Sequence, residues 1–338
     1  MSLSAPLGVA VGFPALAALA IAVALDLAVA EPPERVHPVA LFGSLAEPVD
    51  RSWSRPRPVG VAVAVGLPLL AAAVAGGAVA VAALALPALA VPVAGALLFS
   101  LVSLRMLREV TAEVVALTET DPDAARESIR ALVGRDAADL SPAALRSAAV
   151  ESAAENLADG FVAPLAGFAA GATVGLAVAP ASTLPLVAGV VGAAWVKAVN
   201  TLDSMLGYRS KPVGAASARL DDAVMYLPAR ATAACLALAT GSIGALSRAR
   251  AWAREPGSPN SGWPMATAAA ALDVRLAKPG RYALNPAAAS PSVADAERAV
   301  RLVGVAGAVA VAGAAGWLLA VGWLLPRDGV LSAAGVVG

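Results

Sequence analysis

The sequence predicts an all-α, polytopic integral membrane protein with about five or six transmembrane or membrane-embedded helices and with helical or loop blocks facing the cytoplasm. Apolar residues make up 59% of the 338 residues and charged residues 14%, whereas soluble domains have roughly 45–50% and about 25%. Several apolar stretches reach the ~20 residues that a helix needs to cross about 30 Å of hydrocarbon. The 24 basic and 24 acidic residues balance, which argues against a nucleic-acid partner held by bulk positive charge.

Prolines divide two of the long apolar runs into pairs of predicted spans. Pro87 and Pro92 interrupt the first run, and Pro180 and Pro185 interrupt the second. Because Pro removes a backbone donor and clashes within a helix, each run is expected to form a helical hairpin. The predicted spans are residues 6–30, 59–82, 83–104, 161–179, 182–199 and 302–325.

The basic residues predict the orientation of these spans. Neither hairpin turn contains Lys or Arg, and only Arg327 lies beyond the last span, so 23 of the 24 basic residues share one face. The positive-inside rule makes this face cytoplasmic and places the protein in the cell membrane. The stretch 227–246 is expected to be embedded in the protein or to lie at the interface, because spanning would carry Arg248 and the residues behind it across the membrane.

Four polar blocks connect the spans, and with them they form one predicted membrane-embedded catalytic unit over residues 1–338. In the second block, Asp121-Pro122 and Ser141-Pro142 each place a capping residue before a proline, which predicts two helix starts. No Walker A sequence, dinucleotide fingerprint or nucleophile elbow is present. The polar blocks are residues 31–58, 105–160, 200–222 and 248–301.

The helix predicted after Ser141 carries three acidic residues on one face. Glu151, Glu155 and Asp159 follow the i, i+4, i+8 spacing. Like charges at this spacing repel unless a positive group lies between them, so the functional interpretation is a Mg²⁺ site or a site for a substrate amine. The alternative is a solvated helix face near the membrane.

The third block concentrates oxygen ligands in an otherwise charge-poor chain. Asn200 and Asp203 precede the acidic pair Asp221-Asp222. Such hard oxygen ligands suit Mg²⁺ bridged to phosphates, and nearby cations would neutralise phosphate charge. The alternative is a salt-bridged loop beside the membrane. The accompanying aromatic and basic residues are Tyr208, Arg209, Arg219 and Arg230.

Two further segments present polar side chains on rigid backbone. The only histidine, His37, stands between prolines just after the first predicted span, and either a structural or an orienting role fits it. In the fourth block, Ser258-Pro259-Asn260 forms a turn that presents Asn260 and Trp263, and its alternative is ordinary loop chemistry.

Taken in order, these motifs resemble the membrane-bound adenosylcobinamide-phosphate synthase family of cobalamin biosynthesis along nearly the whole chain. Their order carries the resemblance more than any single motif. Three places depart from the family pattern, namely Ala30-Glu31, Met265 and the segment 277–282. The segments that carry the resemblance are 31–39, Val133-Gly134-Arg135-Asp136, 149–160, Asn200-Thr201-Leu202-Asp203-Ser204-Met205 with Gly207-Tyr208, 218–222, Pro228-Ala229-Arg230 and Ser258-Pro259-Asn260.

The resemblance implies an acid–amine ligase. Such an enzyme joins adenosylcobyric acid to (R)-1-aminopropan-2-ol or to its O-phosphate, with ATP as co-substrate, Mg²⁺ as metal and the corrinoid as substrate. The sequence does not distinguish the free amine from its phosphate. The lipid bilayer and later membrane-bound enzymes of the same pathway are the other expected partners, and no nucleic acid is expected.

The resemblance and the residue chemistry together assign roles to the candidate residues. Glu151 or Glu155 would receive the amine and take its proton, and the amides of Asn156 and Asn200 would orient these groups. The expected metal ligands are Asp203, Asp221, Asp222 and Asp159. The expected catalytic residues are Glu151, Glu155, Asn156 and Asp203. The expected substrate- or phosphate-binding residues are His37, Arg135, Asn200, Tyr208, Arg209, Arg219, Arg230, Asn260 and Trp263.

Two other classes of protein share part of this pattern. A Mg²⁺-dependent membrane prenyl transferase also binds a diphosphate through Asp-rich cytoplasmic loops, but it usually has more spans and two similar Asp-rich motifs. A transporter or a non-enzymatic scaffold is the second alternative. Transporters place ionisable residues near mid-membrane, whereas the polar groups here gather on one face.

Overall fold

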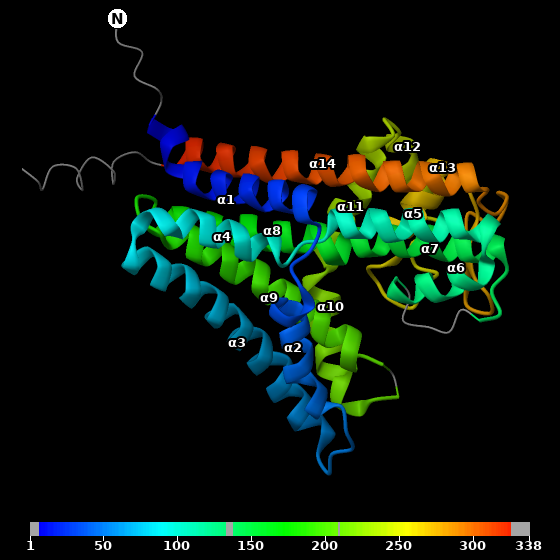
Figure 1. The fold of residues 1–338 in the computed structure, drawn as a ribbon, viewed down its shortest axis with the longest axis horizontal. Helices are drawn as coiled ribbons and strands as arrows, with labels where there is room; N and C mark the ends of the chain where they lie inside the picture. Colours follow the sequence, from blue (N-terminus) through cyan, green and yellow to red (C-terminus); the bar gives the residue numbers. More distant parts are fainter. Residues whose placement is uncertain (1–6, 133–137, 209, 326–338) are drawn as a thin grey trace, which may run out of the picture. The chain divides into compact units, whose positions relative to one another are not determined.

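The structure is a computed structural model that describes residues 7–132, 138–208 and 210–325. Within these residues the protein is helical apart from one two-stranded hairpin (Figure 1), which confirms the all-α, polytopic class. Six helical segments are long and apolar enough to cross a membrane, and each overlaps one predicted span. These segments are Gly12–Val29, Pro56–Ala85, Pro87–Thr120, Pro142–Val178, Leu184–Leu206 and Val293–Leu324.

The elements follow one another along the chain with short connections. The first half contains α1 (Leu7–Val29), η1 (Glu34–Val36), α2 (Pro38–Ala46), η2 (Glu47–Val49), α3 (Pro56–Ala85), η3 (Pro87–Leu89), α4 (Ala90–Phe99), α5 (Leu104–Thr120), α6 (Pro122–Ser128), η4 (Ile129–Ala131), α7 (Pro142–Leu157), the π-helical η5 (Ala158–Val162) and α8 (Ala163–Val178). The second half contains α9 (Leu184–Leu206), η6 (Pro212–Gly214), α10 (Ala215–Val224), α11 (Tyr226–Ala239), α12 (Ile243–Ala249), α13 (Gly262–Leu272), β1 (Leu276–Lys278), β2 (Tyr282–Leu284) and α14 (Val293–Leu324).

Two of the six helical segments begin well before the predicted spans that they contain. The fourth continues without a break from α7 through η5 into α8, because Gly160 is accommodated in the π-helical turn, where its carbonyl accepts the Ser103 N–H at 3.0 Å. The last segment, helix α14, begins at Val293 because Ser292 and Asp295 cap it reciprocally: the Asp295 N–H donates to Ser292 Oγ and the Ser292 N–H donates to the Asp295 carboxylate.

The contacts divide the chain into two compact units, each assembled from segments that are distant in sequence. Unit 1 comprises residues 1–102, 164–221 and 311–338, and unit 2 comprises residues 103–163 and 222–310. In unit 1, α1 packs on α4, and α9 packs on α2 and α3 (Figure 1). The prediction of one catalytic unit over the whole chain stays a prediction.

Helices α8 and α9 of unit 1 cross through glycines. Gly167 and Gly171 of α8 are four positions apart, and a Cβ added at Gly171 would fall on the Ala188 carbonyl of α9. In the same way, a Cβ at Gly192 of α9 would fall on the Gly167 carbonyl. The two backbones therefore touch directly, as they do at crossings of small residues in membrane helices.

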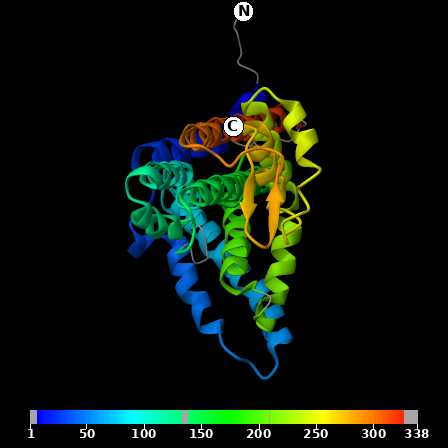
Figure 2. The same cartoon turned by 90° about the vertical axis from the view of Figure 1, so that its right-hand side faces the viewer.

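Unit 2 is a helical layer with one hairpin. Helix α5 packs on α6 and α7, and α13 packs on α7, α11 and α12. Strands β1 and β2 pair antiparallel with Leu276 opposite Leu284, and β1 lies against α7 (Figure 2). The two predicted helix starts are confirmed, because Asp121 and Ser141 accept the N–H groups of Ala124 and Ala144.

The stretch 227–246 forms two helices, and neither is long enough to span. Helix α11 has 14 residues, which gives about 21 Å against the ~30 Å of hydrocarbon. Its side chains Ala233 and Leu236 are buried within unit 2. At Gly241 the chain takes a positive φ of 66°, which ends the helical run before α12. The stretch also leaves Leu227, Leu238 and Ile243 exposed, and the expectation that it is embedded in the protein or lies at the interface stays a prediction.

Candidate functional site

The C-terminal turns of α9 carry a row of polar residues in unit 1. Asn200 is buried, and its Nδ2 donates to Asp221 Oδ1 of α10 at 3.4 Å. Asp203 lies three positions further along α9, on the same side of the helix as Asn200. The structure thus brings together two residues from opposite ends of the third polar block, with a second carboxylate one turn away.

Gly207 makes room for the Asp203 carboxylate. Helix α9 ends at this glycine, whose N–H donates to the Asp203 carbonyl at 2.7 Å. A Cβ at position 207 would fall on Asp203 Oδ1, which is a buried atom. The side chain of Asp203 therefore folds back against the end of its own helix, and only glycine at position 207 permits this.

A second polar group in unit 1 surrounds Lys197, one turn before Asn200. His37 Nε2 lies 3.7 Å from Glu31 Oε2, and Lys197 interacts electrostatically with both residues. His37 caps α2, because its Nδ1 accepts the Val39 N–H at 3.2 Å. The neutral ring therefore carries its proton on Nε2, the atom that faces Glu31.

Burial shifts the pKa values of both partners of this group. Desolvation raises the pKa of Glu31, Lys197 lowers it and Asp26 raises it further. Desolvation lowers the pKa of His37, and the positive charge of Lys197 lowers it further. Both shifts follow from desolvation, which disfavours the charged form of a buried group.

The lowered pKa of His37 predicts a pH-dependent stability. The folded state takes up the His37 proton less readily than the unfolded state, so His37 reduces stability below its folded pKa, and this loss disappears as the pH rises towards the ordinary value of about 6.5. His37→Asn keeps a capping side chain but does not titrate. Wild type is expected to gain stability over this variant between about pH 5 and pH 7, measured as melting temperature in detergent.

The raised pKa of Glu31 changes stability with pH in the opposite direction, so the contributions of Glu31 and His37 can be measured separately. Its contribution is present below the ordinary Glu value of 4.5 and is lost as the pH rises through the raised pKa. Glu31→Gln removes this contribution and should leave the rise due to His37 in place. A melting-temperature difference between wild type and His37→Asn that does not change with pH would contradict the assignment to His37.

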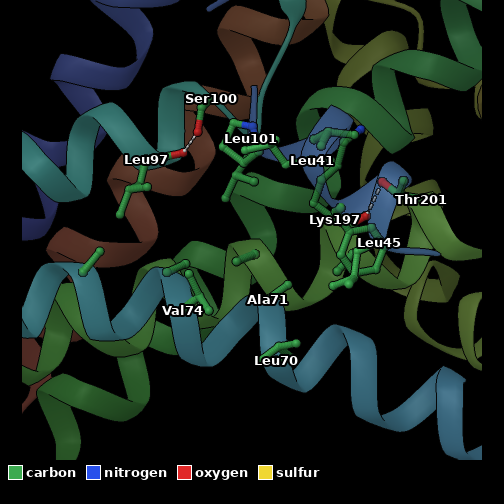
Figure 3. Close-up of a pocket in the computed structure, with 17 residues that line it drawn as sticks. Leu41, Leu45, Leu70, Ala71, Val74, Leu97, Ser100, Leu101, Lys197 and Thr201 are labelled. Atoms are coloured by element: carbon green, nitrogen blue, oxygen red, sulfur yellow. Dashed lines mark hydrogen bonds between the residues drawn. The ribbon is translucent and has the colours of Figure 1, made fainter. Parts of the chain in front are cut away.

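An apolar cavity of about 380 Å³ lies beside Lys197 in unit 1. Helices α2, α3, α4 and α9 line it, with Leu41, Leu70 and Leu101 among the wall residues (Figure 3). Thr201 donates its hydroxyl to the Lys197 carbonyl at 2.8 Å, so that polar group is already satisfied within α9. The cavity therefore suits an apolar group, and Lys197 places one positive charge at the edge of its wall.

Sequence analysis did not single out Lys197, and it named Glu31 only within the segment 31–39 and as a departure from the family pattern, with no role assigned to it. Lys197 falls within the predicted span 182–199, where a charged residue in an apolar helix is itself a sign of function. The position of Lys197 in an apolar segment could therefore have been noticed in the sequence. Its proximity to His37 could not, because that proximity depends on the packing of α2 on α9.

In unit 2, Glu151 is the centre of a buried hydrogen-bond network. Its carboxylate accepts Ser147 Oγ at 3.0 Å and the Tyr282 hydroxyl at 2.7 Å, and Ser147 Oγ in turn accepts the Ala277 N–H at 2.9 Å. Only 4% of Glu151 is exposed, so a solvated helix face does not describe it. The network fixes the hairpin to α7, and Met265 lies beside it with its sulfur 4.0 Å from the Tyr282 oxygen.

The other acidic residues of this helix differ from Glu151. Glu155 and Asp159 are half-buried. Asp159 lies in the π-helical turn, which takes up more residues than an α turn and so rotates it away from the simple i+8 position. Asn156 donates to the Ser152 and Leu132 carbonyls at 2.9 and 3.5 Å, so its amide is engaged by backbone.

Four other predicted site residues meet in unit 2. Arg230 Nη1 donates to Asn260 Oδ1 at 2.8 Å, and Asn260 Nδ2 donates to the Asp222 carbonyl at 2.8 Å. The guanidinium lies 3.5 Å from the ring centre of Tyr226 and 5.3 Å from that of Trp263. Burial raises the pKa of the Asp222 carboxyl. Among the described residues, Arg230 makes three hydrogen bonds with its five N–H donors, which leaves two for a ligand.

The remaining predicted site residues do not belong to these hydrogen-bonded groups. Arg219 is exposed on α10, and Tyr208 is exposed with Lys211 5.1 Å above its ring centre. Arg135 and Arg209 lie outside the described residues. Of the predicted metal ligands, Asp203 and Asp221 belong to unit 1, and Asp159 and Asp222 belong to unit 2.

A metal held entirely by protein side chains finds no support in the described residues. No three His, Cys, Asp or Glu side chains among them gather in a geometry that could hold an ion. Mg²⁺, however, is commonly held by one or two carboxylates together with substrate phosphates, and it keeps several of its waters. Asp203 and Asp221, with Asn200 beside them, fit an ion that arrives with a phosphate.

The fold and these polar groups define a class of protein, a multi-pass helical membrane protein whose ionisable residues gather at the ends of its spans. The chain belongs to the CobD/Cbib protein family, whose model matches residues 19–323.

Relatives match along most of their length. "Cobalamin biosynthesis protein CobD" of Rhodobacter capsulatus is 37% identical over 85% of this chain and 92% of its own. "Probable cobalamin biosynthesis protein CobD" of Methanothrix thermoacetophila is 34% identical over 85% of this chain and 91% of its own. "Cobalamin biosynthesis protein CobD" of Mycobacterium tuberculosis is 38% identical over 80% of this chain and 85% of its own. No solved structure matches the chain.

Proposed function

We propose that this protein is an ATP- and Mg²⁺-dependent ligase of cobalamin biosynthesis that joins adenosylcobyric acid to (R)-1-aminopropan-2-ol or to its O-phosphate. The observation that carries the proposal is the meeting of Asn200 and Asp221, with Asp203 one turn away, at the end of a spanning helix. Membership of the family supports the pathway. The relatives whose printed names state cobalamin biosynthesis support it as well.

The chemistry requires an activated acid. In the proposal a carboxylate oxygen takes the γ-phosphoryl group of ATP and ADP leaves. The amine then attacks the acyl carbon of the acyl phosphate, so that the C–N bond forms as the C–O bond to phosphate breaks, and inorganic phosphate leaves. Positioning and charge neutralisation dominate such a transfer. Asp203 and Asp221 would hold the ion that accompanies the phosphates, and Asn200 would fix the Asp221 carboxylate through its Nδ2.

The amine must lose a proton as it attacks, and a carboxylate is suited to accept it. Glu155 is the more accessible of the two candidates on α7, because Glu151 is buried and accepts two hydroxyl donors. In the proposal Glu155 receives the ammonium and Glu151 keeps the hairpin in place. Within unit 1 the exposed guanidinium of Arg219 would contact phosphate, and within unit 2 the remaining donors of Arg230 are a separate expected phosphate contact.

The proposal includes the location of the reaction. By the positive-inside rule, the polar blocks face the cytoplasm, where ATP is available. The aromatic rings of Tyr208 and Trp263 offer surfaces on which the corrinoid would stack. Later membrane-bound enzymes of the pathway are the expected neighbours.

The test is a direct assay on detergent-purified protein. Adenosylcobyric acid is supplied with aminopropanol or with its phosphate, with and without ATP and Mg²⁺, and products are followed by mass spectrometry. A mass gain that matches one of the two amides and requires ATP and Mg²⁺ is the expected result, and it also identifies the amine. If folded protein forms neither amide, the proposal is contradicted, and consumption of a polyprenyl diphosphate instead would indicate a prenyl transferase.

A further inference from the structure

A second cavity of unit 1, of about 320 Å³, lies where α3 begins. Asp50, Arg51 and Trp53 line it from the loop before α3, and Ser210 and Lys211 line it from the loop after α9. We refer to it as the Arg51–Lys211 pocket. In contrast to the apolar cavity of Figure 3, two cations and two hydroxyl-bearing residues, Ser52 and Ser210, contribute to its wall.

Arg51 is held in orientation without using its hydrogen-bond donors. Its guanidinium carbon lies 4.2 Å from the ring centre of Trp53, and the Trp53 indole N–H donates to the Val49 carbonyl at 2.9 Å. The Arg51 backbone N–H donates to the Val49 carbonyl at 2.8 Å, and within the described part of the chain its guanidinium makes no hydrogen bond and no ion pair. Stacking uses the face of the guanidinium, so the N–H groups along its edge remain available for an anion.

Lys211 is fixed from the opposite side of the pocket. Its Nζ donates to Asp50 Oδ2 at 2.6 Å and to the Met205 carbonyl at 3.1 Å. An ammonium has three N–H donors, so one remains. Arg51 and Lys211 with Asp50 leave the pocket with one net positive charge.

The sequence that follows places this pocket at the membrane surface. Helix α3 is a candidate span that begins at Pro56, and its exposed apolar side chains start at Val61 and continue through Val65 and Leu69. Basic residues and tryptophan next to a span are typical of the interface between lipid and water. An anion bound here lies at the level of the lipid headgroups.

We propose that the Arg51–Lys211 pocket binds a phosphate group, carried either by a phospholipid headgroup or by a soluble phosphate ester. A guanidinium edge matches two phosphate oxygens, and the remaining Lys211 donor and the serine hydroxyls supply further bonds. The volume is at the lower end of the roughly 300–1,000 Å³ usual for small-molecule sites, which leaves room for the substituent of the phosphate. The inference does not depend on the reaction proposed above.

The test measures binding rather than turnover. Isothermal titration calorimetry on the full-length protein in a nonionic detergent uses two probes, inorganic phosphate and dihexanoylphosphatidylglycerol below its critical micelle concentration. Arg51→Gln removes the oriented guanidinium. Arg55→Gln is the matched control, because Arg55 is an exposed arginine of the same loop that does not line the pocket.

Saturable binding of either probe is expected, and it should weaken at least about tenfold in Arg51→Gln but remain within about twofold in Arg55→Gln. Saturation by the short-chain lipid alone identifies a headgroup site, and saturation by inorganic phosphate identifies a site for a soluble ester. Absence of saturable binding to wild type would overturn the inference. Equal weakening in both variants would also overturn it, because a general juxtamembrane charge effect would then account for the binding.

Discussion

Replacing Asp203 by asparagine is expected to lower Mg²⁺-dependent turnover at least about a hundredfold. The substitution keeps the size of the side chain and removes its negative charge. Asp203 and Asp221 are the two carboxylates that the proposal assigns to the ion, so an ion that arrives with a phosphate would lose half of its charged protein ligands. Asp203 is half-buried at a helix end, so we expect the variant to fold.

The measurement is the rate of amide formation as a function of Mg²⁺ concentration. Ser204→Ala is the matched control, because Ser204 is the exposed next residue of α9 and, among the described residues, its hydroxyl donates to the Asn200 backbone carbonyl, at 3.0 Å, and not to a carboxylate. Unchanged turnover in Asp203→Asn would refute a metal role for this residue. Gly207→Ala adds an independent test, because it keeps the carboxylate but forces it from its position; an intermediate loss is expected.

Much of the fold could be predicted because membrane spans depend on local composition. Each of the six predicted spans overlaps a long apolar helix, and prolines indicated the breaks between paired spans. The capping residues Asp121 and Ser141 indicated two helix starts correctly. At residues 142–160 the polar residues of α7 were assigned to a separate cytoplasmic helix, whereas the structure joins them to the predicted span 161–179 in one continuous helical segment.

Less of the candidate site could be predicted, because its contacts join residues that are distant in sequence. The Tyr282 hydroxyl reaches Glu151 across 131 positions, and the spacing of neither residue indicates this. The sequence analysis identified both Arg230 and Asn260 as candidate residues. It did not predict the hydrogen bond that joins them. The cavity beside Lys197 depends on four helices at once. Periodicity identifies which face of a helix is apolar, and tertiary packing decides what that face meets.

The crossing of α8 and α9 carries the prediction with the largest expected effect on stability. Gly171→Ala places a methyl group on the Ala188 carbonyl and 3.1 Å from the Gly189 Cα. Backbone atoms of a packed helix cannot move aside as the end of a flexible side chain can, so we expect a loss of about 3 kcal/mol. In detergent this should appear as a fall in melting temperature of about 5 °C or more.

Gly77→Ala is the control for this experiment. Gly77 lies in α3, and a Cβ there meets no atom within 4 Å, so alanine should leave the melting temperature unchanged or raise it, since alanine favours helix by up to about 1 kcal/mol. Equal melting temperatures for Gly171→Ala and wild type would show that the two helices can separate at no cost. Because α9 also carries Lys197, Asn200 and Asp203, a shifted crossing should lower turnover as well. A second substitution elsewhere in the chain could restore the melting temperature of Gly171→Ala. If turnover stays low in that double variant, the position of α9, and not stability alone, sets the geometry of the candidate site.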